Sequence, residues 1–194
     1  AMQKYGQLAD VGDCETMSDV IDRYLREIAP LKAESTYKDN IKQSKYLRAA
    51  FGKMRPIHIT PKIVYQYLDE RGKSSQVQAN REIALLSHMF KKCIRWGFVS
   101  TNPVKGVERF KEKPRERYVT DEEFEAFKAF AGPEIAAYLD FKLLTGLRKG
   151  DILRLKRSPI QDDGLHAYIS KTRKIIVIET TDASSAAVHA ILNP

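Results

Sequence analysis

Residues 75–96 carry the clearest periodic pattern in the chain, and this pattern decides what kind of domain must surround them. The apolar side chains recur at helical spacing and form one stripe: Ile83, Leu86, Phe90, Cys93 and Ile94. The basic side chains fall within about 60° of one another on the opposite face: Arg81, His88, Lys92 and Arg95. The sequence therefore predicts an amphipathic helix that buries one face in a helical domain and presents a face of uniform positive charge.

Three helices are expected before this one. Thr16 and Asp19 form a capping-box pattern at the start of the first. The second and third are expected over residues 34–51 and 61–72, each ending at a glycine. The N-terminal part of the chain therefore reads as a small four-helix domain.

A second basic stripe lies on the helix predicted over residues 34–51. Lys38, Lys42 and Lys45 form a narrow arc beside its apolar face. A merely solvated surface is the ordinary explanation of one such stripe. Two of them in one small domain favour a surface that follows a phosphate backbone.

Composition divides the chain into four parts. They are an N-terminal extension (residues 1–15), the helical domain (16–104), a linker (105–117) and a second domain (118–194). The linker is charged, contains Pro114 and has no sustained apolar period. The second domain, at about 80 residues, is near the lower size limit for a self-sufficient core.

The second domain should be mixed α and β. Thr120 and Glu123 predict a capped helix whose apolar stripe is formed by Phe124, Phe127 and Phe130. A second helix is expected over residues 134–144. Two short β-rich runs, residues 165–170 and 174–179, flank a turn at 171–173 and predict a hairpin. Asp182 is expected to cap a last helix over residues 183–192.

The stretch LLTGLRKGDILRL at 143–155 places Arg148 just after a helix break at Thr145-Gly146 and three residues before Asp151. Arg148 is then expected in the first turn of a new helix, where a guanidinium beside backbone N–H groups could hold a phosphate. The alternative is an ordinary i,i+3 surface ion pair between Arg148 and Asp151.

The totals narrow the class of partner. The net charge of +8 and the pI of about 9.4 indicate a polyanion, nucleic acid before a membrane surface. Two cysteines and four scattered histidines predict no metal site, and no glycine-rich phosphate loop predicts a nucleotide cofactor. Without an apolar span or a signal core, we expect a cytoplasmic protein.

Three segments in the right order carry a resemblance to the tyrosine recombinases, also called phage integrases: residues 79–113, 115–127 and 143–160. The resemblance covers nearly the whole chain from about Thr16. It implies a mainly α fold, with a four-helix SAM-like core-binding domain followed by an incomplete mixed α/β catalytic domain with a small β-hairpin. It also implies breakage and rejoining of double-stranded DNA through a 3′-phosphotyrosyl link, without metal or cofactor.

The family's catalytic groups map onto three positions. Arg148 matches the first catalytic arginine, Asp151 the acidic position that braces it, and Lys171 the lysine that protonates the leaving 5′-oxygen. Lys174 is close enough in sequence to be the alternative to Lys171. The family's H-x-x-R block, its later His or Trp, and its nucleophilic tyrosine are not found downstream of the hairpin, and the last tyrosine is Tyr168.

The resemblance also suggests how DNA is held, because family members clamp it between the two domains. The expected backbone contacts are Lys42, Lys45, Arg81, Lys92 and Arg95, with Asn80 as a candidate base reader. The parent recombinase would form a tetramer on DNA, and this chain is expected to be a monomer that binds DNA without cleaving it. The alternatives are a truncated integrase remnant that acts only as a DNA-binding module, and a helical adaptor for an acidic protein.

Overall fold

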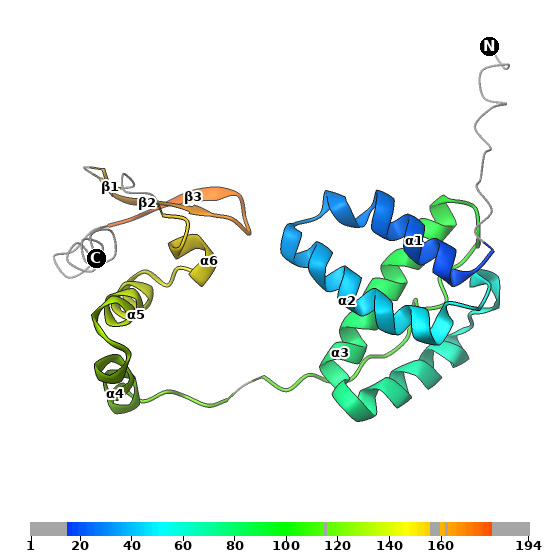
Figure 1. Cartoon of the computed structure of the whole chain (residues 1–194), viewed down its shortest axis with the longest axis horizontal. Helices are drawn as coiled ribbons and strands as arrows, with labels where there is room; N and C mark the ends of the chain where they lie inside the picture. Colours follow the sequence, from blue (N-terminus) through cyan, green and yellow to red (C-terminus); the bar gives the residue numbers. More distant parts are fainter. Residues whose placement is uncertain (1–14, 115, 156–159, 162, 180–194) are drawn as a thin grey trace, which may run out of the picture. The chain divides into compact units, whose positions relative to one another are not determined.

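The computed structural model describes residues 15–114, 116–155, 160–161 and 163–179, and these fall into two compact units (Figure 1). The N-terminal unit comprises residues 1–114 and the C-terminal unit residues 115–194. The expected helix over residues 183–192 and its cap at Asp182 lie outside the described residues. The division falls at Pro114, within the linker expected from composition.

The N-terminal unit is entirely helical in its described part. Its elements are α1 (Met17–Glu27), the 3₁₀ turn η1 (Ala29–Leu31), α2 (Glu34–Phe51), the 3₁₀ turn η2 (Pro56–His58) and α3 (Pro61–Arg95). The Thr16–Asp19 capping box is present at the start of α1, as the sequence predicts. Although α3 is 35 residues long, no described helix is both long and apolar enough to cross a membrane.

A break inside α3 corresponds to the two helices expected there. Ser75 has extended backbone angles (φ −164°, ψ 104°), so the helix changes direction at this point (Figure 1). Gly72, which the sequence places at a helix end, lies within the first segment instead. A glycine is needed there for a reason other than ending a helix, because a Cβ at this position would lie 2.4 Å from the ring of Phe110.

One apolar core holds the N-terminal unit together. It is built from the inward faces of α1, α2 and both segments of α3, with Tyr24, Phe51, Ile83, Leu86 and Phe90 among its fully buried side chains. The apolar stripe predicted for residues 75–96 supplies much of this core, although Ile94 remains 40% exposed. The packing of four helical segments around one core is therefore the arrangement that the periodic pattern predicts.

The linker is shorter than composition suggests, because its first half packs on the N-terminal unit. Asn80 donates to the Phe110 carbonyl oxygen (2.8 Å) and its amide oxygen accepts from the Phe110 N–H (3.0 Å). The Glu108 N–H donates to the Tyr65 hydroxyl (3.0 Å). Residues up to about 112 thus belong to the N-terminal unit.

In its described part, the C-terminal unit combines three helices with a three-stranded antiparallel sheet in the order β1-β2-β3. Its elements are α4 (Asp121–Ala131), α5 (Pro133–Thr145), α6 (Lys149–Ile152), β1 (Ile160–Gln161), β2 (Gly164–Ile169) and β3 (Lys174–Ile178). The β2–β3 hairpin pairs Leu165 with Ile178 and Ile169 with Lys174, which places residues 170–173 in the turn as expected. The short strand β1 was not expected from the sequence.

A small second core joins the hairpin to the helices. Phe141 of α5, Leu147 between the helices and Ile152 of α6 pack against Leu165, Ala167 and Ile169 from β2. By contrast, α4 buries none of its residues: Phe127 is 55% exposed and Phe130 is 91% exposed. The predicted phenylalanine stripe exists, but the described residues do not cover it.

Candidate phosphate site and nucleic-acid interface

Arg148 precedes α6 and does not lie in its first turn. It is the N-cap residue, with extended backbone angles (φ −73°, ψ 147°), and its carbonyl oxygen accepts from the N–H groups of Asp151 and Ile152. The helix break before it is the one predicted, since Gly146 ends α5 in the left-handed conformation (φ 64°). Because α6 is only four residues long, the expected contribution of a helix N-terminus to phosphate binding is not supported.

The Arg148 side chain is exposed, and it makes no ion pair or hydrogen bond with the described residues. Its neighbour Leu147 is 3% exposed and anchors the segment in the second core. The guanidinium is therefore held near a fixed point of backbone while its five donors stay free for an anion.

Asp151 does not form the surface ion pair with Arg148 considered above. Its carboxylate is 2% exposed, and Oδ1 accepts from the Ser170 hydroxyl (2.6 Å) and the Ser170 N–H (3.0 Å). The hydrogen bonds from Ser170 hold the pKa of this carboxyl below its usual range, with a smaller contribution from the positive charge of Arg148. Its other oxygen, Oδ2, is buried without a hydrogen-bond partner among the described residues.

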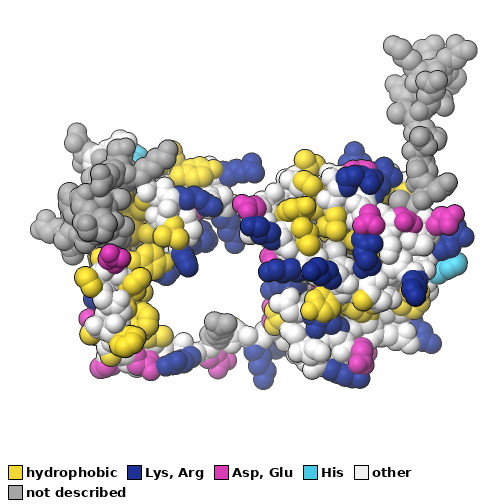
Figure 2. All heavy atoms as spheres, viewed as in Figure 1, with side chains coloured by type: hydrophobic (Ala, Val, Ile, Leu, Met, Phe, Trp, Pro, Cys, Tyr) yellow, Lys and Arg dark blue, Asp and Glu magenta, His cyan; other side chains and the backbone are white. Residues whose placement is uncertain are grey.

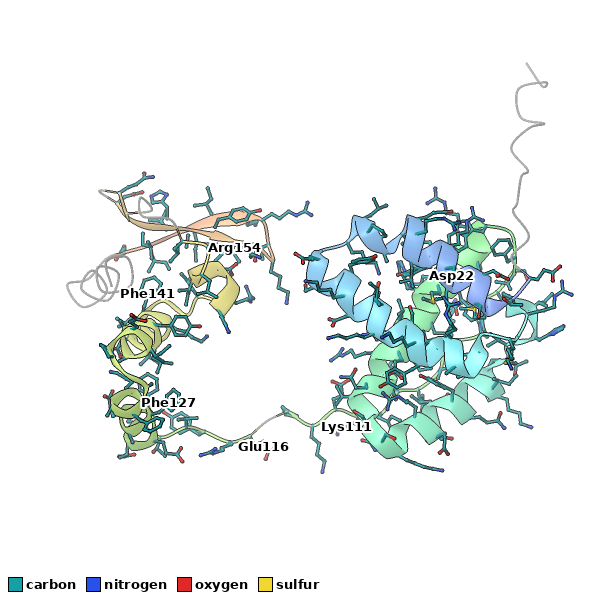
Figure 3. All side chains as sticks on the ribbon, viewed as in Figure 1. Asp22, Lys111, Glu116, Phe127, Phe141 and Arg154 are labelled. Carbon is teal, nitrogen blue, oxygen red and sulfur yellow. The ribbon has the colours of Figure 1, made fainter. Side chains whose placement is uncertain are left out.

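This contact fixes the turn that carries Lys171. Ser170 directly precedes Lys171, and the N–H groups of Thr172 and Arg173 both donate to the Ile169 carbonyl oxygen, which closes the turn. Lys171 itself is exposed. The hydrogen bonds of Asp151 thus connect the start of the Lys171 turn to the helix that follows Arg148, and both cations belong to one small packed unit. Figure 3 labels two residues of this unit, Phe141 on α5 and Arg154 just after α6.

The residues expected to contact DNA in the N-terminal unit have different surroundings. Lys42, Lys45 and Arg95 are exposed and make no ion pair with the described residues. Arg81 is paired with Glu112 of the linker segment (3.1 Å). Lys92 is half-buried near Lys32 and His88.

Asn80 does not have the position of a base reader. It is 4% exposed, and both ends of its amide are used by the backbone of Phe110, with a further contact to Glu112 (3.0 Å). Its role is to anchor the linker segment on α3. Asn80 directly precedes Arg81 in the sequence, but the sequence does not reveal that a distant segment covers Asn80 and leaves Arg81 accessible.

Positive side chains that the sequence analysis left out also gather on this unit. A groove of about 910 Å³ between the end of α3 and residues 100–109 is lined by Lys91, Lys105 and Arg109, with no acidic residue in its lining. Lys32, between η1 and α2, donates to the Tyr24 hydroxyl (2.6 Å) and to Asn40 Oδ1 (3.0 Å). Neither Lys32 nor the three cations of the groove belong to a periodic basic stripe. No pattern of charges along one helix could therefore have identified them.

Net charge separates the two units sharply. Residues 1–114 contain 21 Lys and Arg against 13 Asp and Glu, a net charge of +8, whereas residues 115–194 contain 12 of each. Figure 2 shows Lys and Arg side chains over the visible face of the N-terminal unit. Among the described residues, no group of three His, Cys, Asp or Glu side chains is placed to hold a metal ion.

Comparison with known proteins gives one consistent result, although no model of a known protein family matches the chain. A Haemophilus influenzae protein named as an integrase/recombinase is 27% identical over 168 residues, which are 80% of this chain and 55% of that protein. The integrase of Escherichia phage HK022 is 34% identical over 113 residues, 57% of this chain and 31% of that integrase. The chain therefore spans about half the length of the first relative and a third of the second.

The solved structures that resemble this chain are also integrases. A lambda integrase dimer bound to a COC′ core site has a TM-score of 0.75 and 26% identity, over 87% of this chain and 65% of that one. A lambda integrase tetramer bound to a Holliday junction has a TM-score of 0.77 at 22% identity, over 100% of this chain and 61% of that one. The second similarity concerns the fold alone.

Proposed function

Because this chain belongs to the tyrosine recombinase (phage integrase) family, we propose that it is the part of a site-specific recombinase that holds duplex DNA and presents a scissile phosphate to Arg148 and Lys171. The observation that carries the proposal is the division of charge: the whole net charge of +8 belongs to the N-terminal unit. Solved relatives of this fold are bound to DNA. Exposed lysines without acidic partners can neutralise backbone phosphates and release the counterions condensed on the duplex.

Arg148 binds the non-bridging oxygens of the scissile phosphate. Its side chain is exposed and has no partner among the described residues, so binding does not require breaking an existing ion pair. In the transition state, where negative charge builds on those oxygens, the fixed guanidinium stabilises the charge. Asp151 acts on this site through Ser170, because it orients the turn that carries Lys171.

Lys171 delivers the proton to the leaving 5′-oxygen as a nucleophilic tyrosine attacks the phosphorus. The attack forms the bond from the tyrosine oxygen to phosphorus and breaks the bond from phosphorus to the 5′-oxygen. Tyr168 lies within β2 and precedes Lys171, so it does not match the nucleophile, which follows the hairpin in the family. We propose that residues 1–194 bind DNA without forming the covalent link.

Two measurements test the proposal. Fluorescence anisotropy with a labelled duplex should give a binding constant that weakens steeply between 50 and 200 mM salt, as expected when several phosphates are neutralised. A nicked duplex that traps covalent intermediates should yield no protein–DNA adduct on a denaturing gel. Binding that does not depend on salt would contradict phosphate contact. A covalent adduct would contradict the proposal that this chain binds DNA without forming the covalent link.

A truncated remnant that acts only as a DNA-binding module is the second candidate. The neutral C-terminal unit favours it, as does the exposure of Phe127 and Phe130 among the described residues, because both fit a domain that contributes little to binding by itself. The two candidates differ in the reading frame: a recombinase continues past Pro194 into H-x-x-R and a tyrosine.

In solution this chain is a monomer, whereas the parent recombinase assembles as a tetramer on DNA. Analytical ultracentrifugation with and without duplex DNA tests whether the chain alone is a monomer.

A further inference from the structure

A continuous line of hydrogen bonds joins three elements of the N-terminal unit near the end of α1. Lys32 Nζ donates to the Tyr24 hydroxyl (2.6 Å), and that hydroxyl is 2.7 Å from Nδ1 of His88 on α3. Lys32 also donates to Asn40 Oδ1 on α2 (3.0 Å). Tyr24 and Asn40 are buried, so the ammonium group of Lys32 is held in one place rather than moving freely in solvent.

The direction of the protons follows from the chemistry of the three groups. An ammonium only donates, so the Tyr24 oxygen accepts from Lys32 and its hydrogen is directed at His88 Nδ1. Burial raises the pKa of Tyr24 to about 12, which keeps this hydroxyl a neutral donor. His88 is then the neutral tautomer with its hydrogen on Nε2, and no described group accepts that hydrogen.

The cluster is positive and lacks acidic partners. Burial lowers the pKa of His88, and the charges of Lys32, Lys92 and Lys91 lower it further. The pKa of Lys32 is lowered by burial and by Lys92. No Asp or Glu among the described residues forms an ion pair with any of these side chains, whereas Arg48 and Arg71 in the same unit are both paired.

We propose that Lys32, His88 and Lys92 form a binding site for one backbone phosphate of duplex DNA. The site deepens the proposed function and rests on it. A phosphate supplies acceptor oxygens for the Lys32 ammonium and the His88 Nε2–H, and a negative charge for a cluster that has none. Since Tyr24 and Asn40 already hold Lys32 in place, little side-chain freedom is lost when the phosphate binds. All three side chains are half-buried and therefore remain accessible.

The test compares two lysines in the full chain. Lys32→Met removes the central charge but keeps the apolar stem. Lys53→Met is the matched control, because Lys53 is exposed between Gly52 and Met54, whose carbonyls accept from the opposite end of α1. Anisotropy titrations with a random-sequence duplex of about 20 base pairs, repeated at several salt concentrations, give affinity and salt slope.

Lys32→Met should weaken binding about tenfold near 0.1 M salt and reduce the salt slope by about one. Lys53→Met should change the affinity less than twofold. Equal effects of the two variants, with wild-type binding intact, overturn the phosphate site and leave the proposed function standing. A wild-type chain that binds no duplex at all overturns both.

A second measurement does not depend on a variant. NMR titration of the histidine imidazoles in the wild-type chain should show the pKa of His88 rising when duplex DNA is added, because the phosphate offsets the charges of Lys32, Lys91 and Lys92. His58, the exposed last residue of η2, is the internal reference. By linkage, DNA affinity should then increase as the pH falls through the titration range of His88. A His88 pKa that DNA leaves unchanged overturns the site.

Discussion

The Asp151 carboxylate joins two segments that are 19 residues apart in the sequence. It receives two hydrogen bonds from Ser170, the residue before Lys171, and it follows Arg148 by three residues. One acidic side chain thus connects the surroundings of both cations. If that connection positions Lys171, weakening it should loosen the turn before it affects the rest of the unit.

Ser170→Ala tests this. The hydroxyl hydrogen bond to a carboxylate is lost while the backbone one remains, so amide hydrogens of the β2–β3 hairpin should exchange roughly fivefold faster at neutral pH. Because Ser170 holds the pKa of Asp151 below its ordinary value of 3.8, the difference from wild type is full above that pH. It should shrink as the pH falls through the lower, folded-state pKa. A difference that grows on acidification would contradict this role.

Gly72 and Phe110 make a second residue-scale test. Gly72→Ala should destabilise the N-terminal unit by about 1–3 kcal/mol, because the new Cβ meets the Phe110 ring and the linker segment must move. Trypsin should then cut faster after Lys111. Phe110→Ala in the same chain removes the clash, so the effect of Gly72→Ala in that background should be much smaller. Additive effects of the two substitutions would show that the ring contact is not responsible.

How far single residues could be predicted depends on the range of their contacts. The caps at Thr16 and Thr120 and the helix break at Gly146 involve residues within four positions, and each was predicted from the sequence. The family resemblance predicts that Asn80 reads bases and that Asp151 braces the arginine. Their actual partners, Phe110 and Ser170, are 30 and 19 residues away, and local patterns carry no information about such contacts.

At the scale of elements, α3 depends on a buried ion pair across its break. Arg71 and Tyr67 lie before Ser75, and both bond the Glu82 carboxylate that follows it. Glu82 is 1% exposed, and Arg71 also lies over the ring of Tyr46. Hydrogen bonding to Glu82 raises the pKa of Arg71, so the guanidinium keeps its positive charge in the folded state. The network fixes the angle between the two segments of α3.

Arg71→Ala should therefore destabilise the N-terminal unit by about 3 kcal/mol, because it leaves a buried carboxylate without its cation. Trp96, the single tryptophan, packs in this unit beside Phe98 and Arg23, so its fluorescence in a urea titration reports the loss. Lys73→Ala removes an exposed ion pair with Glu70 on the same helix and should leave the urea midpoint nearly unchanged. Equal shifts for both variants would mean that the buried network does not hold the break.

Element boundaries were largely predictable because periodic apolar residues and helix-ending glycines mark them. The helix over residues 34–51, the helix over residues 121–131 and the hairpin around residues 171–173 lie where the sequence predicts them. The break at Ser75 was also predicted, since separate helices were expected over residues 61–72 and 75–96. The length of α6 was not predictable, because its sequence has the composition of a longer helix but it contains only four residues. There, tertiary packing outweighs local propensity.

At the scale of the whole molecule, the two units have different physical characters. The N-terminal unit has a continuous apolar core and the entire net charge of +8. The C-terminal unit is electrically neutral and leaves Phe127, Phe130 and Leu143 largely exposed among the described residues. The sequence indicated a basic protein, but only the division into units shows where that charge resides. In our account, the N-terminal unit supplies most of the affinity for DNA, and the C-terminal unit supplies Arg148 and Lys171.

The most direct test of this account compares the salt dependence of duplex binding for two pairs of substitutions. Lys42→Gln with Lys45→Gln neutralises two exposed lysines of the N-terminal unit, and Lys142→Gln with Lys149→Gln neutralises two exposed lysines of the C-terminal unit. The first pair should lower the slope of log affinity against log salt by about two, and the second by less than one. If the second pair lowers the slope as much as the first, the N-terminal unit is not the principal holder of DNA and the account is wrong.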